Sequence, residues 1–324
     1  MSESRSSVGL DVVVLAGGLS HERDVSIRSG RRVAEALRDE GMSVDVHDVD
    51  GDLVAYLDEM RPDVVWPILH GATGEDGAIR DLLDLIGAPY VGTGASGSRL
   101  SWSKPIAKST IRAAGLATPS SVTLPQELFR ELGAKAVMRA VLDRMGLPLV
   151  VKPATGGSAL GVTRVGESGE LPHAMVSCFA YGDTALIERE AVGTELGISV
   201  VDLGDGPVAL PPVEVQTIQG PYDFDARYNP GRSEYFVPCR LAPEHRLAAE
   251  RAAITAHRAL GLRHLSRTDM IVDGTGTPWF LEVNTAPGMT EPSLFPLAAQ
   301  PSAWSPGELD AAIVRAALRE VSGT

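Results

Sequence analysis

The chain has 324 residues, of which 44% are hydrophobic and 22% are charged, and its formal net charge is −13 at pH 7. This length can form two or three domains with substantial cores. The acidic balance argues against a general nucleic-acid binder, whose surface would be basic, so we expect no nucleic-acid partner. Any phosphate site must consist of a few local Lys, Arg and backbone N–H groups.

The N-terminus and the two cysteines favour a cytoplasmic protein. The segment MSESRSSVGLDVVVLAGG lacks the apolar core and cleavage pattern of a secretory signal, and no apolar run approaches membrane-spanning length. Cys178 and Cys239 show no disulfide or zinc spacing, so we expect small buried thiols. We therefore predict a cytoplasmic location and no membrane partner.

Strand-like and helical runs alternate from the start of the chain. DVVVLAGG, SVDVHDV, PDVVWPILHG and PYVG have the pattern of strands, and SIRSGRRVAEALRDEGM and AIRDLLDLIG have the pattern of helices. Such alternation predicts parallel βαβ units covered by helices. We place a first α/β domain over residues 1–94.

A glycine-rich loop marks the next segment, residues 95–188. A helical run begins near Lys104, and LPLVVKPATGGSALGVTRV then predicts strand, loop and strand before another strand, DTALIERE. Lys152 ends the first strand, and three glycines follow it: Gly156, Gly157 and Gly161. Glycines let backbone N–H groups approach an anion, and a Lys adds a point charge. A plain hairpin turn explains this loop equally well, and it is not a P-loop because no Gly-Lys-Ser/Thr opens a helix.

We assign a final domain to residues 189–324. It contains the polar run TIQGPYDFDARYNPGRSEY, which is rich in Gly, Pro and Asn and has little periodicity. This composition predicts a long loop over about residues 217–235. Long ordered loops inside compact domains are commonly lids or binding loops, so we expect a lid here.

The segment RTDMIVDGTGTPWFLEVN is the strongest indication of function. It predicts two strands joined by an Asp-Gly-Thr-Gly turn, which brings Asp269 roughly opposite Glu282 and Asn284. The latter two are two residues apart in a strand, so their side chains leave the same face. Two carboxylates and an amide oxygen suit Mg²⁺, which usually keeps waters and is completed by substrate phosphates. The segment therefore indicates nucleotide chemistry.

A purely structural explanation of these residues is weaker. Asp269 could merely flank a hairpin, and Glu282 could lie on a solvated strand face. However, PWFLEVN is almost wholly apolar around its one Glu, and a buried carboxylate needs a partner. Arg267 adds a positive guanidinium on the same strand face. We therefore favour a metal site.

The exit of the first strand carries polar residues. Gly17 and Gly18 lie where open α/β sheets bind ligands, although a complete dinucleotide-binding motif is missing. Glu22 and Ser26 follow near a helix start, where acids and Ser act as caps. Capping suffices for Ser26, whereas Glu22 is a candidate ligand for an ammonium group.

A second strand exit reads LHGATGEDGAIR. His70 is the one histidine of the seven beside a glycine-rich strand exit, yet by itself it is better explained as a satisfied core residue. Glu75 and Asp76 precede a helix, where capping explains them.

Six motifs occur together and in order: HERDVSIRSG, HGATGEDG, YVGTG, VVKPATGGSALGV, YDFDARYNPG and RTDMIVD with FLEVNTAPGMT. In this combination the sequence resembles the D-alanine–D-alanine ligases of the ATP-grasp superfamily over nearly the whole chain. The resemblance implies an α/β fold of three domains, a Rossmann-like one first, with ATP between the central and C-terminal domains. It also implies a homodimer that makes D-alanyl-D-alanine for peptidoglycan, the cell-wall polymer.

The resemblance implies roles for individual residues. ATP would contact Lys104, Lys152, Gly156, Gly157, Ser158, Gly161, Glu188 and Glu195. Two Mg²⁺ ions, replaceable by Mn²⁺, would bind Asp269, Glu282 and Asn284. The two D-alanines would contact Glu22, His70, Arg267, Gly288, Ser293 and Leu294. Within this set Glu22 would bind the first ammonium group, His70 would lie near the first carboxylate, and Ser293 with Leu294 would receive the second.

Two further catalytic roles follow from the same resemblance. Glu22, Ser158 and Tyr228 would form a hydrogen-bonded set that fastens the lid, and Arg267 with the Gly288 N–H group would face the oxyanion. The chain also departs from the family pattern: Ala159 replaces a frequent Ser, Arg227 replaces the usual Lys, and Arg189 and Glu190 follow Glu188 in place of an aromatic residue. The purine contact therefore stays open.

The implied reaction has two steps. A carboxylate oxygen of the first D-alanine attacks the γ-phosphorus of ATP, and the amine of the second then attacks the acyl phosphate. No enzyme nucleophile is required, in agreement with the lack of a nucleophile motif in the sequence. Three alternatives stay open: an ATP-grasp ligase with D-lactate, D-serine or a biosynthetic amino acid as acceptor, a nicotinamide-dependent oxidoreductase, and a non-catalytic nucleotide-binding regulator.

Overall fold

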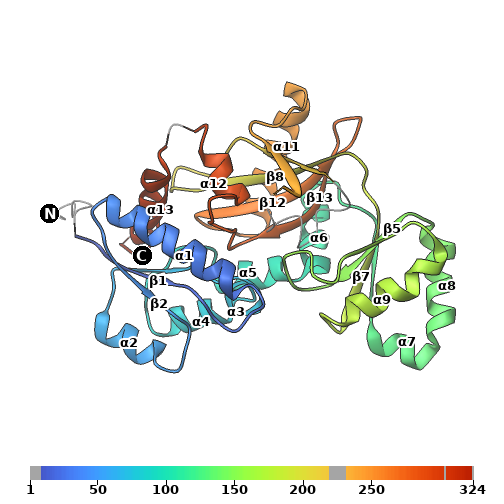
Figure 1. Cartoon of the computed structure of the whole chain (residues 1–324), viewed down its shortest axis with the longest axis horizontal. Helices are drawn as coiled ribbons and strands as arrows, with labels where there is room; N and C mark the ends of the chain where they lie inside the picture. Colours follow the sequence, from blue (N-terminus) through green and yellow to red (C-terminus); the bar gives the residue numbers. More distant parts are fainter. Residues whose placement is uncertain (1–8, 219–230, 303, 323–324) are drawn as a thin grey trace.

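The computed structural model describes residues 9–218, 231–302 and 304–322. Its strands form three separate sheets, and helices cover them (Figure 1). The first sheet holds three parallel strands in the order β2-β1-β3: β1 (Asp11–Leu15), β2 (Ser43–His47) and β3 (Val64–Pro67). Helices α1 (Arg23–Asp39) and α2 (Leu53–Met60) connect them, so the predicted parallel βαβ units are confirmed.

The segment PYVG does not form the predicted fourth strand. Tyr90 makes only an isolated parallel bridge with Val65. Pro89 supplies no N–H group, and the chain turns at Gly92, whose φ is +105°, so a ladder cannot extend in either direction. Short helices then lead to the second sheet: α3 (Ala72–Glu75), α4 (Ala78–Leu85), α5 (Ala95–Trp102) and α6 (Lys104–Ala113).

The second sheet is antiparallel, in the order β4-β7-β5-β6. Its strands are β4 (Ser121–Pro125), β5 (Leu149–Pro153), β6 (Thr163–Val165) and β7 (Thr184–Arg189). Three helices and a 3₁₀ turn pack around it: α7 (Gln126–Leu132), α8 (Ala134–Met145), η1 (Ser168–Glu170) and α9 (Leu171–Phe179). The glycine-rich loop joins β5 to β6, which confirms the predicted strand–loop–strand unit.

The third sheet has the order β11-β10-β8-β12-β13, with β9 paired to β8. Its strands are β8 (Thr194–Val201), β9 (Val208–Ala209), β10 (Val213–Thr217), β11 (Ser233–Phe236), β12 (Leu265–Val272) and β13 (Pro278–Asn284). The long helix α11 (Pro243–Ala259) packs on β8 and β12. Residues 217 and 233–235, which we assigned to a loop, pair as strands, because their partners on β10 and β11 satisfy the backbone.

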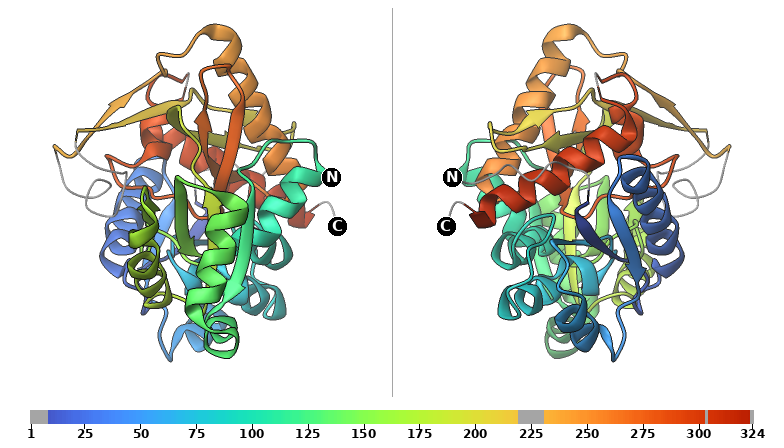
Figure 2. Two further views of the ribbon diagram at one scale, coloured as in Figure 1. Left: turned by 90° about the vertical axis from the view of Figure 1, so that its right-hand side faces the viewer. Right: turned by 90° about the vertical axis from the view of Figure 1, so that its left-hand side faces the viewer.

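Helix α13 (Pro306–Ser322) returns to the start of the chain. It packs against α1 and β3, and the red C-terminal helix meets the blue helix α1 at an angle in the right-hand view of Figure 2. One hydrophobic cluster contains both Val33 of α1 and Ile313 of α13. The C-terminal helix therefore completes the first core, and the division into domains at residues 94 and 188 stays a prediction.

The structure bears on the cysteines and on membrane-spanning helices, in the residues that it describes. Cys178 and Cys239 are buried and form no disulfide, as predicted. Burial raises the pKa of the Cys178 thiol to about 12, so it is inert at neutral pH. In the described parts of the chain, every helix is too short or too polar to cross a bilayer.

Candidate active site

Strands β12 and β13 bring the predicted metal ligands together. Asp269 pairs directly with Glu282, and Arg267 pairs with Asn284, before a register shift that follows Asp269. Asp269 and Arg267 are both buried. The predicted opposition of Asp269 with the other two residues is therefore confirmed, because the short turn after Val272 fixes the hairpin register.

Cations surround these two carboxylates. Arg267 donates from Nε and Nη2 to Asp269 Oδ1 and Oδ2, at 2.7 and 2.8 Å. The Asn284 amide nitrogen lies 3.4 Å from Asp269 Oδ2, and the Lys104 ammonium lies 3.2 Å from Glu282 Oε2. Nearby cations thus balance the negative charge of the site. The side-chain atoms that could bind a metal here are all oxygens.

This donor set suits a divalent cation that another molecule helps to hold. Over the residues that the structure describes, no three His, Cys, Asp or Glu side chains are grouped as a closed metal site. The protein offers two carboxylates and one amide oxygen, which is fewer than the six ligands of Mg²⁺. Such a set fits Mg²⁺ only if phosphate oxygens and water complete it.

A cavity of about 190 Å³ adjoins these carboxylates, between the second and third sheets. Most predicted ATP ligands line it: Lys104, Lys152, Gly156, Gly157, Glu188 and Glu195, together with Asp269 and Glu282. Ser158 and Gly161 do not border it. Apolar side chains complete its walls: Val150, Leu160, Val162, Ile271 and Leu281. We call it the phosphate-side cavity.

Glu188 is the most buried acid of the phosphate-side cavity. Its carboxylate lies 2.5 Å from both the Lys108 and the Lys152 ammonium groups. Burial by itself raises the pKa of Glu188, but the two ammonium groups outweigh it and lower that pKa. Glu188 is therefore ionised and fixes Lys152 at the cavity wall, with both of its oxygens engaged by lysines.

The glycine-rich loop lies over this cavity in a strained conformation. Ser158 and Ala159 have φ values of +50° and +57°, which are rare for residues with a side chain. The Lys104 ammonium donates to the Gly156 carbonyl, which ties the loop to the start of α6. Strain held by such contacts is common where a loop must approach a ligand closely.

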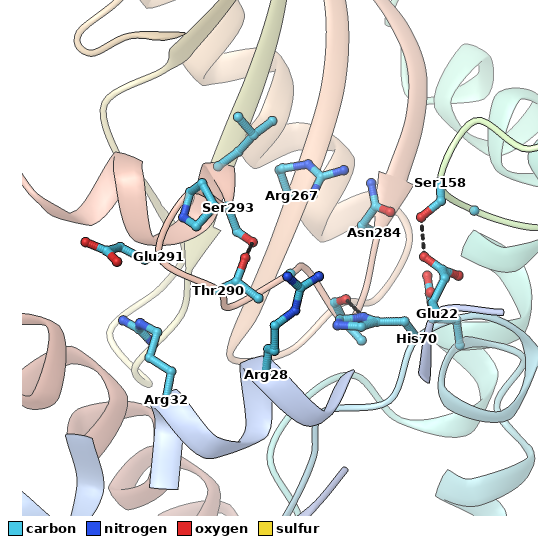
Figure 3. Close-up of a pocket in the computed structure, with 16 residues that line it drawn as sticks. Glu22, Arg28, Arg32, His70, Ser158, Arg267, Asn284, Thr290, Glu291 and Ser293 are labelled. Carbon is cyan, nitrogen blue, oxygen red and sulfur yellow. Dashed lines mark hydrogen bonds between the residues drawn. The ribbon is translucent and has the colours of Figure 1, made fainter. Parts of the chain in front are cut away.

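A second cavity, of about 370 Å³, lies on the other side of the loop (Figure 3). We call it the amino-acid cavity. All the described residues with a predicted substrate role line it: Glu22, His70, Arg267, Gly288, Ser293 and Leu294. Ser158 also faces this cavity. Tyr228 and Arg227 lie outside the described residues.

Glu22 and His70 stand together at one end of the amino-acid cavity. Ser158 Oγ donates to the buried Glu22 carboxylate, so two of the three predicted lid-fastening residues are in contact. His70 Nδ1 donates to the Ala286 carbonyl at 3.1 Å, and its Nε2 has no partner among the described residues. Burial lowers the pKa of His70, so the buried Nε2 carries a lone pair.

Nearby polar residues are less simple than caps. Ser26 lies one turn inside α1, where its hydroxyl accepts from the Gly17 amide and donates to the Ile68 carbonyl; it ties two strand ends together, and the capping prediction is wrong. Asp76 accepts from the Ala78 amide at 2.8 Å, but the N-cap residue of α4 is Gly77, so Asp76 is not the predicted cap. Glu75 accepts from the Gly71 amide, and burial next to Glu22 raises the pKa of Glu75 to about 8.

Several lining residues of the amino-acid cavity were not predicted, among them four that are charged or carry a hydroxyl group. Arg28 and Arg32 come from α1, and Thr290 and Glu291 come from the segment before α12 (Leu294–Ala299). Arg28 and Arg32 are four residues apart, which puts both on one helix face, but only the tertiary structure turns that face to the cavity. Lys108 was also missed, although its spacing from Lys104 places both on one face of α6.

The two cavities adjoin at two places. Gly157 borders both of them, and the ion pair of Arg267 with Asp269 joins them, because Arg267 lines the amino-acid cavity and Asp269 lines the phosphate-side cavity. A group anchored in one cavity can therefore react with a group anchored in the other.

Comparisons with known proteins show the family of the chain. A family model described as D-ala D-ala ligase C-terminus matches residues 110–315. The D-alanine--D-alanine ligase of Pelotomaculum thermopropionicum is 38% identical over 291 residues, which are 90% of this chain and 91% of that protein. The chain therefore belongs to the D-alanine–D-alanine ligase family.

Solved structures show the same fold. The D-alanine--D-alanine ligase of Bacillus anthracis in complex with ATP has a TM-score of 0.80 and 27% identity, covering 97% of this chain and 99% of that one. The VanG D-Ala:D-Ser ligase of Enterococcus faecalis has a TM-score of 0.79 and 25% identity, covering 98% and 96%. The chain thus has the ATP-grasp fold that we expected.

Proposed function

We propose that this protein joins two D-alanine molecules to D-alanyl-D-alanine, with cleavage of ATP to ADP and phosphate. The observation that carries the proposal is the contact between the two cavities at Gly157 and at the Arg267–Asp269 pair. One cavity offers lysines and a glycine-rich loop to phosphates, and the other offers Glu22 to an ammonium group. A transfer from phosphate to carboxylate needs this adjacency.

The donor amino acid binds at the Glu22 end of the amino-acid cavity in this proposal. The Glu22 carboxylate holds its ammonium group, and the lone pair on His70 Nε2 accepts from a neighbouring N–H. Its carboxylate then points past Gly157 toward the phosphate-side cavity. There, an oxygen of that carboxylate attacks the γ-phosphorus of ATP, the bond to the β-phosphate oxygen breaks, and ADP leaves.

The phosphates of ATP lie against Lys104, Lys152 and the loop at Gly156 and Gly157. Glu188 keeps Lys152 in place, and the positive groups lower the energy of the charge that develops on the transferred phosphoryl group. Asp269, Glu282 and Asn284 would hold Mg²⁺, with Mn²⁺ as a substitute. When bound, the metal supplies charge neutralisation at the phosphate oxygens.

The acceptor amino acid binds at the opposite end, near Ser293 and Leu294. Its neutral amine attacks the acyl carbon of the acyl phosphate and forms a tetrahedral intermediate. The bond between that carbon and the phosphate oxygen then breaks, and phosphate leaves with its electron pair. Arg267 and the Gly288 N–H group face the oxyanion of that intermediate. The amine loses a proton in this step, so a peptide bond, phosphate and one proton result.

Further parts of the proposal concern the cellular role. We assign the protein to the cytoplasm, where ATP is available, and to the supply of peptidoglycan precursors. A homodimer is the expected assembly. The support for these assignments is the family membership of the chain.

The experiment that tests the function measures phosphate release from ATP with a panel of amino acids, followed by mass analysis of the product. The panel contains D-alanine alone and D-alanine paired with D-serine, D-lactate or L-alanine. We expect phosphate release and D-alanyl-D-alanine with D-alanine alone. A mixed product in preference to it would favour a ligase with another acceptor, and ATP binding without phosphate release would contradict the proposal.

A further inference from the structure

Arg28 is a cation at the amino-acid cavity to which the proposed reaction assigns no role. Its side chain leaves α1 and extends into the cavity between Thr290 and His70 (Figure 3). Its Nε reaches the Asp24 carbonyl only at 3.4 Å, which is a weak hydrogen bond. Most of the donor capacity of this guanidinium group therefore faces the cavity.

The other guanidinium groups of the cavity are committed to carboxylates. Arg267 binds Asp269 through two hydrogen bonds, and Arg32 pairs with the buried Asp310 at 3.3 Å. Among the described residues that line the cavity, Arg28 is thus the guanidinium without a carboxylate partner. An Arg fork matches the two oxygens of a carboxylate, so the ligand that fits it is a carboxylate.

The nearby Thr290 and Ser293 hydroxyl groups would bind a carboxylate more weakly than the Arg28 guanidinium does. Thr290 Oγ1 and Ser293 Oγ lie 2.7 Å apart and bond each other, so one of their donors is used internally. Glu291 adds a negative charge at the same end of the cavity, which repels an incoming carboxylate. A cation is needed there to offset this repulsion.

The backbone at Arg28 is also held at a fixed place relative to those hydroxyl groups. Its neighbour Ser29 is buried, and Ser29 Oγ accepts from the Met289 amide at 3.2 Å. This contact fastens α1 to the segment that carries Thr290 and Ser293. Because the helix is already ordered, binding at Arg28 costs side-chain entropy only.

We propose that Arg28 is a specificity-determining residue that binds the carboxylate of the acceptor amino acid, and so selects acceptors with a free carboxylate. This inference rests on the proposed function. It means that a cation on α1 helps to bind the acceptor carboxylate, in addition to the groups around Ser293. The donor amino acid, at the Glu22 end, does not depend on Arg28.

The test separates the two halves of the reaction. Hydroxylamine is a small uncharged nucleophile that attacks an acyl phosphate, forming a hydroxamate and releasing phosphate, so it reports the donor half alone. We expect Arg28→Gln to leave the rate of hydroxamate formation within twofold of the parent. The same variant raises the KM for acceptor D-alanine about fivefold, the effect of one partly exposed ion pair.

Two further variants serve as controls. Arg28→Lys keeps the charge but not the fork geometry, so its acceptor KM should lie between those of the parent and Arg28→Gln. Arg31→Gln removes the same charge from an exposed residue of the same helix that lines neither cavity, so it leaves the acceptor KM within twofold of the parent. Added salt raises the acceptor KM of the parent and has a smaller effect on Arg28→Gln, because the ion pair is screened.

The outcomes distinguish this inference from the proposed function. Equal acceptor KM values for Arg28→Gln and Arg31→Gln, with hydroxamate formation intact, would overturn the role of Arg28 alone. No hydroxamate from the parent protein with ATP, Mg²⁺ and D-alanine would overturn the proposed function, and the inference with it.

Discussion

Glu188 holds two buried ammonium groups at once, and removing its charge tests that arrangement. In Glu188→Gln, Lys108 and Lys152 lose their carboxylate partner. The side chain of Glu188 is only 3% exposed, so water cannot replace that partner. Breaking a buried ion pair by removing one partner typically costs about 3–5 kcal/mol. We expect the free energy of unfolding, measured by urea denaturation, to fall by about that amount.

The control for this prediction is an ion pair on the surface. Asp143 lies 3.7 Å from Arg139 on α8, and its side chain is 71% exposed. Asp143→Asn removes the same charge without leaving a buried cation, so it should not change stability measurably. Similar losses in both variants would show that the burial of Glu188 is not the cause.

Glu282 tests the proposed metal site at the same scale. Glu282→Gln removes charge at nearly constant shape, so we expect kcat to fall at least about 100-fold, as for loss of a group that stabilises transition-state charge. Circular dichroism should show an unchanged fold. The control is Glu127→Gln, an exposed acid of α7 that lines neither cavity; near-normal turnover in Glu282→Gln would refute the metal assignment.

Individual site residues were predictable where local geometry fixes them. Asp269 and Glu282 could be placed opposite each other because a short turn and two-residue alternation leave few registers. Lys108 and Arg28 could not be assigned in this way, because their partners and surroundings come from distant segments. Ser26 was misread for the same reason: its hydroxyl bonds the backbones of two strand ends.

At the scale of elements, the turn after β3 requires a glycine at position 74. Gly74 lies in α3, where an added Cβ would overlap the Leu69 carbonyl group. Gly74→Ala must therefore open this turn and displace His70 and Glu75 from the amino-acid cavity. We expect a loss of about 1–3 kcal/mol in stability, as for overpacking, with a much larger fall in kcat/KM.

Gly51→Ala is the matched control for this element. Gly51 is exposed, has no neighbouring atom within 4 Å of an added Cβ and does not adopt a left-handed conformation. Thermal unfolding and kcat/KM should both be unchanged in this variant. Unchanged kcat/KM in Gly74→Ala would mean that the turn does not position the site.

Several strands and three helices (α1, α4 and α6) followed from periodicity, and the errors have physical causes. PYVG has strand composition, but Pro89 withholds an N–H group and the segment stops at one bridge. Residues 233–235 have loop composition, yet they pair with β10, because a sheet edge offers hydrogen bonds that composition does not record. The boundaries of the loop were therefore too wide.

At the scale of the whole molecule, His264 links the N-terminal and C-terminal parts of the chain. It is buried, and its Nδ1 accepts from the Gly92 amide at 2.9 Å. Burial, with the nearby Arg263 charge, lowers the pKa of His264 to about 3. Protonation would also place a hydrogen on Nδ1 and break the bond to Gly92.

This pKa makes stability depend on pH. Between pH 6.5 and pH 3 the unfolded chain binds a proton at His264 and the folded chain does not, so stability falls as the pH falls. From pH 7 to pH 5, His264 accounts for a loss of about 2 kcal/mol in the free energy of unfolding. His264→Asn removes this contribution, and Asn tolerates the φ of +60° at this position.

Urea denaturation at pH 5 and pH 7 measures the difference. The slope of stability against pH should be smaller in His264→Asn than in the parent, and His173→Asn, at an exposed site, should leave it unchanged. The same slope in His264→Asn and the parent would contradict the assignment. Such a contact across 172 residues, like the packing of α1 on α13, follows from the fold and cannot be obtained from local patterns.

Gly157 presents nothing larger than hydrogen to either side, and a Cβ there would stand 3.5 Å from a Glu22 oxygen. Gly157 lines both cavities, so its backbone lies between them at this point. In the proposed chemistry, a labile phosphorylated species would arise beside Gly157 and meet its next reactant without travelling through solvent. The short path itself then protects this species from hydrolysis. A bulkier residue at position 157 would separate the two reactants.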